Sequence, residues 1–124
     1  MTEKGFFNGI NRPLEPSNLT EMEMKHLPVI ETPDTITAGE PFDVTISVGN
    51  IPHVMEVAHH IQWVDLYFGE NFITKVLFTP VFTRARATIT IVENGDGGTA
   101  ILRAVERCNV HGIWENTKDI AVKK

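Results

Sequence analysis

The only cysteine in the chain lies three residues before a histidine, in the segment Cys108-Asn109-Val110-His111-Gly112. A thiolate and an imidazole at this spacing can face one centre when the backbone turns tightly, and Gly112 permits the unusual backbone angles of such a turn. Together they form a soft donor pair that suits zinc, copper or iron better than magnesium or calcium. Taken alone, the motif is equally consistent with a buried cysteine beside a loop histidine.

All five histidines and the cysteine are confined to three short segments. These are residues 25–31 (KHLPVIE), 51–61 (IPHVMEVAHHI) and 108–114 (CNVHGIW). In their order and internal spacing the three segments resemble those of superoxide reductases, in particular the small one-iron form called neelaredoxin. The resemblance runs in order from about residue 25 to residue 115.

The resemblance implies a single iron ion per chain, cycling between Fe2+ and Fe3+, with one open position for superoxide. Its ligands would be one axial thiolate and four equatorial imidazoles, from Cys108, His26, His53, His59 and His111. The thiolate pushes electron density onto iron, as it does in cysteine-ligated haem. The implied reaction is the one-electron reduction of superoxide to hydrogen peroxide. A rubredoxin-like protein would supply the electron, and the chain would form a homo-oligomer, most simply a tetramer.

Three further residues complete this interpretation. Lys25 corresponds to the family's lysine beside the open position, where we expect it to attract the anionic substrate. His60 directly follows a ligand on a predicted strand, so its side chain should face the other way. Backbone carbonyls and Asn109 are candidate hydrogen-bond partners for the ligating imidazoles.

At Met24 the sequence departs from the family, which usually carries a glutamate immediately before the lysine. That glutamate can ligate ferric iron, and neither Glu21 nor Glu23 stands in its position. A thioether is a poor match for the oxidised ion, so we expect the ferric site to be five-coordinate or to bind water or hydroxide.

The sequence is also compatible with two other functions. One is an enzyme that mainly dismutates superoxide, cycling iron in both directions. The other is a non-catalytic β-sandwich module that holds structural zinc, for which a closed four-ligand site would be expected.

Composition narrows the class of protein. The 124 residues predict one domain, 1–124, with residues 1–24 as an irregular N-terminal arm. A net charge of −5 argues against nucleic-acid binding, and no apolar run reaches the length of about 18 residues that suggests a membrane span. The first residues lack a secretory pattern and the lone cysteine cannot form an internal disulfide, so we expect a cytoplasmic protein.

The elements that must position the candidate ligands are predicted to be strands. Apolar and polar residues alternate from Phe42 to Val48, with the period of a half-buried strand. A helical turn is possible at residues 20–23, and the glycine-rich stretch 94–98 predicts a hairpin. The predicted strands begin near residue 29 and continue at 42–48, 60–68, 72–78, 82–92, 99–107 and 118–122. This pattern predicts an all-β antiparallel sandwich of about seven strands, and the resemblance implies an immunoglobulin-like form of it.

Overall fold

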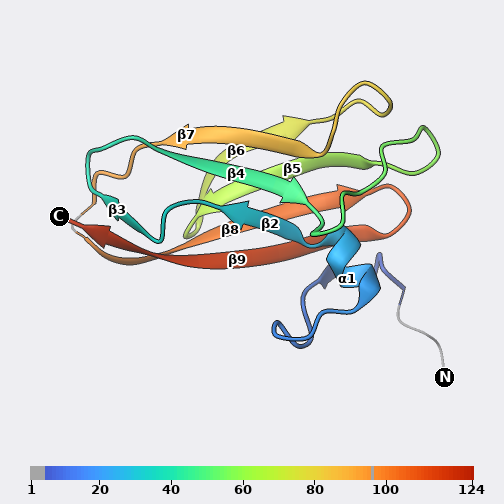
Figure 1. Ribbon diagram of the computed structural model, residues 1–124, viewed down its shortest axis with the longest axis horizontal. Coiled ribbons are helices and arrows are strands. Elements are labelled where there is room, and N and C mark those ends of the chain that lie inside the picture. The colour runs from blue at the N-terminus through green and yellow to red at the C-terminus, as the bar shows by residue number, and fades with distance from the viewer. Residues whose placement is uncertain (1–4, 96) are drawn as a thin grey trace.

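The structure, a computed structural model, describes residues 5–95 and 97–124 as a sandwich of two β-sheets (Figure 1). The larger sheet contains β1 (Ile10–Asn11), β3 (Thr35–Thr37), β5 (Ile61–Phe68), β6 (Asn71–Leu77), β8 (Gly98–Cys108) and β9 (Gly112–Lys123). The smaller sheet contains β2 (Pro28–Glu31), β4 (Phe42–Val48) and β7 (Arg86–Ile91). A short helix, α1 (Glu21–His26), precedes β2. No helix in the described ranges is long and apolar enough to cross a membrane.

The strand order explains how the two layers form. In the larger sheet it is β1-β9-β8-β5-β6, with β3 also paired to β9, and in the smaller sheet it is β2-β4-β7. The long strands pair antiparallel, whereas the short strands β1 and β3 pair parallel with β9. The predicted β-sandwich is therefore confirmed, and each of the seven predicted strands has a counterpart.

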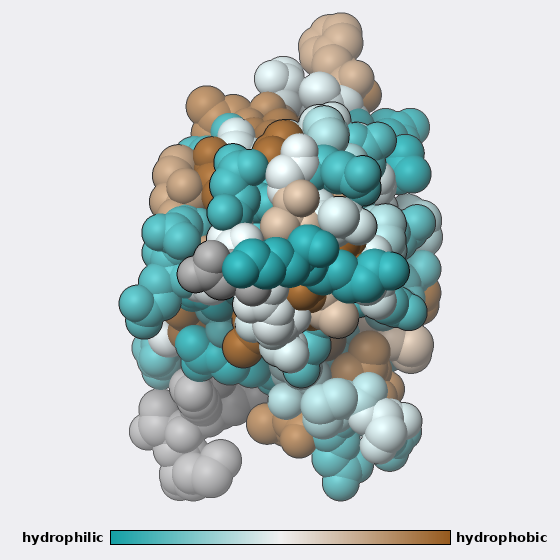
Figure 2. Space-filling model, turned by 90° about the vertical axis from the view of Figure 1, so that its left-hand side faces the viewer, coloured by the Kyte–Doolittle hydropathy of each residue, from teal (hydrophilic) through white to brown (hydrophobic). Residues whose placement is uncertain are grey.

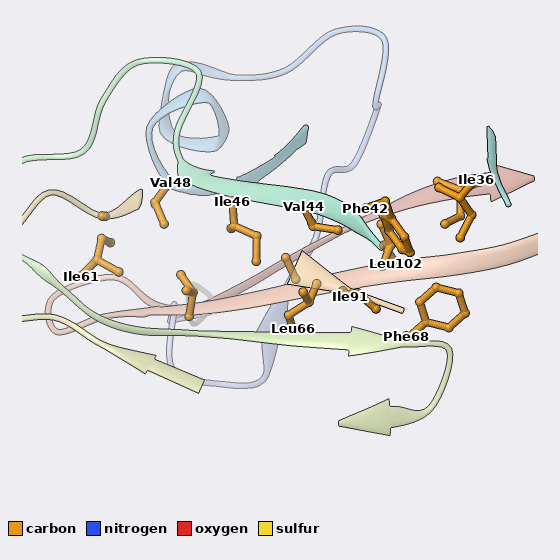
Figure 3. Packing of buried hydrophobic residues seen from close by; sticks show 14 of the residues in the cluster. Ile36, Phe42, Val44, Ile46, Val48, Ile61, Leu66, Phe68, Ile91 and Leu102 are labelled. Carbon is orange, nitrogen blue, oxygen red and sulfur yellow. The ribbon is translucent and has the colours of Figure 1, made fainter. Parts of the chain in front are cut away.

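The core lies between the sheets and follows from the alternation of residue types along β4. Val44 and Ile46 are buried, whereas Asp43 between Phe42 and Val44 is exposed. Figure 3 shows Val44 and Ile46 pointing from β4 toward the larger sheet, which presents Leu66 to them. Burying each such aliphatic side chain contributes about 1.5–3 kcal/mol, so this face of β4 is an important part of the contact between the layers.

The predicted hairpin at residues 94–98 is wrong. β7 pairs with β4 and β8 pairs with β5 and β9, so the chain between them crosses from one sheet to the other. Asp96, in the middle of this stretch, lies outside the described residues. A glycine-rich run indicates that the chain turns, but the choice of pairing partner depends on which faces are buried.

Two strand boundaries also differ from the prediction. β7 begins at Arg86 rather than near residue 82, because residues 80–82 form a turn that is closed by Thr83 Oγ1 donating to the Thr79 carbonyl at 2.7 Å. β9 begins at Gly112 rather than at residue 118. Polar residues near the start of β9 made this part of the strand hard to predict from the sequence. The structure accommodates one of them, Glu115, through two ion pairs on the outer face of the sheet, at 2.8 Å and 2.9 Å.

The predicted N-terminal arm contains regular structure. Its residues Ile10 and Asn11 form β1 against β9, and α1 begins at Glu21, inside the predicted arm, and continues through His26. In Figure 1, α1, the turn between β8 and β9 and the loop after β4 lie at one end of the sandwich, and the C-terminus lies at the other. Figure 2 shows the C-terminal end, where hydrophilic side chains cross the middle of the surface.

Candidate metal centre

The cysteine motif forms the turn between the two longest strands. β8 ends at Cys108, β9 begins at Gly112, and these two residues pair across the turn. The backbone N–H of His111 donates to the Cys108 sulfur at 3.3 Å, and His111 Nδ1 lies 3.9 Å from the same sulfur. Gly112 has a φ of 79°, a left-handed conformation that is easily adopted by glycine. The turn therefore brings the His111 imidazole beside the buried thiol.

His26 is the last residue of α1, and the start of this helix is fixed by a capping box. Thr20 Oγ1 accepts from the Glu23 N–H at 3.1 Å, and Glu23 Oε1 accepts from the Thr20 N–H at 2.8 Å. His26 Nδ1 donates to the Met22 carbonyl at 2.8 Å. Burial lowers the pKa of His26 to about 4, so the ring is neutral at pH 7 and its Nε2 keeps a free lone pair.

The loop between β4 and β5 supplies His53 and His59. His53 Nδ1 donates to the Val54 carbonyl at 2.7 Å, and burial lowers the pKa of His53 to about 4. Its Nε2 lies 3.6 Å from the Cys108 sulfur. His59 Nε2 is buried and has no hydrogen-bond partner within the described part of the chain. A buried polar nitrogen without a partner is costly, and a bound cation would satisfy it.

The Nε2 atoms of His26 and His53 face each other at 3.2 Å. Both rings donate Nδ1–H to a backbone carbonyl, so in the neutral rings both facing atoms are acceptors and no hydrogen bond can join them. Imidazole nitrogens lie about 2.0–2.1 Å from a bound zinc ion, so two such ligands at right angles lie about 3 Å apart. The spacing therefore fits two ligands of one metal ion.

The four imidazoles together form a square. Neighbouring ring centroids are 4.7 Å apart for His26–His53 and His53–His59, 5.1 Å for His59–His111 and 4.8 Å for His111–His26. The diagonal His26–His59 is longer, at 6.3 Å. The candidate ligand atoms of His26, His59, Cys108 and His111 all lie within 4.8 Å of one another. The side chains predicted from the sequence to donate to a metal thus lie around a common centre.

Asn109 joins the cysteine turn to the histidine loop. Its Nδ2 donates to the Ala58 carbonyl at 3.1 Å, and its Oδ1 accepts from the His60 N–H at 2.8 Å. Asn109 thus fixes the backbone of the loop, whereas the carbonyls of Met22 and Val54 orient imidazoles. His60 Nδ1 donates to the Glu56 carbonyl of its own loop at 3.1 Å.

Comparison with known proteins agrees with this geometry. Residues 18–117 match the desulfoferrodoxin family. The chain belongs to this family. It is 35% identical to the neelaredoxin of Megalodesulfovibrio gigas, over 80% of this chain and 88% of that protein, and 36% identical to the superoxide reductase of Pyrococcus furiosus, over 74% and 85%. The solved superoxide reductase (neelaredoxin) from Ignicoccus hospitalis superposes with a TM-score of 0.79 at 34% identity, covering 92% of this chain and 95% of that one. The resemblance to neelaredoxin-type superoxide reductases is therefore confirmed.

Lys25, predicted to lie beside the open position, precedes His26 in the last turn of α1. Its side chain is 45% exposed and forms an ion pair with Glu21 at 3.1 Å. A lysine in the last helical turn also interacts favourably with the helix dipole. The structure thus places an exposed cation on the residue next to a candidate ligand.

Glu23 is fully engaged elsewhere. Its Oε1 accepts from Thr20 N–H and its Oε2 from the Leu14 N–H at 3.0 Å, and the Thr20 backbone bond is the main cause of its lowered pKa. The helical turn considered possible at residues 20–23 is present, because α1 begins at Glu21 and includes Glu23. Glu23 is unsuited to act as a metal ligand in place of the glutamate that is absent at position 24, because both of its oxygens hold the start of the helix.

Sequence reasoning missed one neighbour of the site. The ring of Phe6 lies edge-on to His111, with centroids 5.1 Å apart. Trp114 stacks on His26, with ring centroids 5.0 Å apart, and donates Nε1–H to the His111 carbonyl at 2.9 Å. The only sequence signal for Phe6 was a pair of phenylalanines in an otherwise polar arm.

Proposed function

We propose that this chain is a superoxide reductase with a mononuclear iron centre. Superoxide, one electron and two protons give hydrogen peroxide. The observation that carries the proposal is the square of four imidazoles beside one thiol, formed by three segments far apart in the sequence. The names of the relatives in the desulfoferrodoxin family support the same activity.

The proposed ligands are His26, His53, His59, Cys108 and His111. These residues would hold an iron ion, which would supply the electron that superoxide takes up. Imidazole ligands would add no negative charge to the ion, which would favour an anionic substrate. Burial raises the pKa of the Cys108 thiol in the metal-free protein, and a bound cation reverses this by deprotonating the sulfur.

Lys25 is proposed to recruit the substrate. The chain carries a net charge of −5, which repels superoxide overall. A local cation within the screening length of about 8–10 Å is needed to overcome this repulsion. Lys25 is exposed and adjacent in sequence to the ligand His26, so it is suited to attract the anion and to order water for proton delivery.

Two measurements test this function. Metal analysis of the purified protein should find one iron per chain, with the visible absorption of an iron(III)–thiolate site. Peroxide should form in a ratio of one per superoxide consumed when a reductant is present. A ratio of one to two that does not respond to reductant would indicate a dismutase, and a colourless zinc protein would contradict the redox proposal. The proposed set has five donors, one more than a closed four-ligand zinc site would use.

Three further features are proposals that accompany this function. The electron would come from a rubredoxin-like donor, the chain would assemble as a homo-oligomer such as a tetramer, and it would work in the cytoplasm. Reduction of the iron by a purified rubredoxin and sedimentation of the purified protein test the first two.

A further inference from the structure

The four imidazoles are oriented by different means. His26 and His53 each donate Nδ1–H to a backbone carbonyl, as metal-binding histidines usually do. Two backbone hydrogen bonds, of 3.1 Å and 2.9 Å, join His59 to Glu56 and fix the backbone at His59. No hydrogen bond to His111 Nε2 exists among residues 5–95 and 97–124. His111 also lies on a turn and is only partly buried, so packing against neighbouring rings contributes to its orientation.

Phe6 provides one such contact. Its ring meets the His111 ring nearly at a right angle, with an interplanar angle of 86° and centroids 5.1 Å apart. The same ring lies 5.9 Å from Trp114, which stacks on His26. Edge-to-face pairs at these distances are favourable beyond their buried area. Phe6 therefore restricts rotation of the His111 imidazole and supports the neighbouring indole.

The arm that carries Phe6 is fixed to β9 by specific bonds. Asn11 Nδ2 donates to the carbonyls of Phe6 and Ile113, each at 2.9 Å, and β1 pairs with β9 beside them. A side chain at Gly112 would collide with the Phe6 carbonyl, so the glycine also provides room for the arm. Phe6 lies before residue 18, where the desulfoferrodoxin match begins.

We propose that Phe6 is a positioning residue of the metal centre. Its ring holds the His111 imidazole with Nδ1 toward the Cys108 sulfur and thereby slows loss of the metal. The inference depends on the proposed role of His111 as a ligand. It adds a contact from outside the three histidine and cysteine segments.

The test compares Phe6→Ala with Phe6→Tyr and Phe7→Ala. Phe7 is the matched control, because it is the adjacent phenylalanine, it is 54% exposed, and its ring lies 5.4 Å from the Arg107 guanidinium rather than on an imidazole. Each protein is loaded with zinc, and transfer of zinc to an excess of coloured chelator is followed. Loss of an orienting partner typically weakens metal binding 10–100-fold, so we expect zinc release about tenfold faster from Phe6→Ala. Phe6→Tyr and Phe7→Ala should release zinc at the parental rate.

Histidine-ring NMR of the zinc-loaded proteins provides a second measurement. The His111 ring signals should broaden or shift in Phe6→Ala, while those of His53 stay unchanged. Parental release from Phe6→Ala, or equally fast release from Phe7→Ala, would overturn the role of the Phe6 ring without affecting the proposed function. Unchanged zinc affinity in His111→Ala would instead remove His111 from the ligand set and refute both.

Discussion

Lys25 Nζ lies 3.1 Å from Glu21 Oε1, one turn earlier on α1. Both side chains are open to water, with 45% of the lysine and 75% of the glutamate exposed. Ion pairs of this kind on a helix surface contribute only about 0.3–0.5 kcal/mol to stability. An arriving anion therefore competes readily with Glu21, and Lys25 stays available as a local cation beside His26.

Lys25→Ala should slow the second-order reaction with superoxide by about tenfold at low ionic strength, because local electrostatic steering raises association rates by at least that factor. Added salt should affect the variant less than the parent. Pulse-radiolysis rates at several salt concentrations measure both effects. An unchanged rate with an unchanged salt response would make Lys25 an ordinary surface lysine.

Glu21→Gln tests the same ion pair from the side of its carboxylate. It removes the carboxylate that partly neutralises Lys25, so the reaction should become roughly twofold faster at low salt, as expected for one charge acting through water. In the Lys25→Ala background the same substitution should have a smaller effect. Equal effects in both backgrounds would show that Glu21 acts on superoxide directly.

Cys108→Ser should leave a folded sandwich that still binds some metal, because the four imidazoles remain. The visible band of the ferric protein should disappear and most of the reduction of superoxide should be lost, since an alcohol does not supply the charge of a thiolate. Absorption spectra and peroxide yield are the measurements. Retained colour with full activity would exclude Cys108 as the axial ligand.

Met24→Glu should shift the ferric band, because a carboxylate is a hard donor that suits iron(III). Glu23→Ala should leave the band unchanged, since both Glu23 oxygens are bound at the start of α1 and in the arm. It should instead lower the free energy of unfolding by about 1–2 kcal/mol through loss of the cap. A band shift in Glu23→Ala would mean that Glu23 reaches the metal.

The candidate ligands were predicted from sequence because three short segments resemble those of a known family in order and spacing. Cys108 and His111 are three residues apart with a glycine following, and a turn of that length leaves few arrangements. His26 was assigned through its motif alone. Its orientation depends on the helix that follows Thr20, and a six-residue helix carries little periodic signal.

The contacts between distant segments could not be predicted in this way. Asn109 binds the backbone of Ala58 and His60, about fifty residues earlier, and Phe6 reaches His111 from the N-terminal arm. β1 and β3 were missed because two or three residues show no alternation, and their pairing with β9 compensates for weak local preference.

Histidine burial gives the metal-free protein a characteristic pH dependence. The pKa values of His26 and His53 are lowered to about 4, from about 6.5 in the unfolded chain. Between these values the unfolded chain binds more protons than the native state, so the stability due to these groups is lost as the pH falls from 6.5 toward 4. Denaturant unfolding of the metal-free parent and of His53→Gln at pH 4.5 and 7 should show a smaller acid loss in the variant. Equal losses would mean that His53 titrates normally in the fold.

Glu106 gives the opposite dependence at higher pH. Its carboxylate oxygens are buried without a partner in the described residues, and burial raises the pKa of Glu106 well above its usual value. Above about pH 4.5 the native state therefore keeps a proton that the unfolded chain releases, and stability falls by about 1.4 kcal/mol per pH unit until the native pKa is passed. Glu106→Gln removes this dependence but leaves a buried amide to satisfy. We expect the metal-free parent to be the more stable of the two proteins at pH 5 and the metal-free variant to be the more stable at pH 8. Parallel stability curves for the two proteins from pH 5 to pH 8 would show that Glu106 is ionised in the native state.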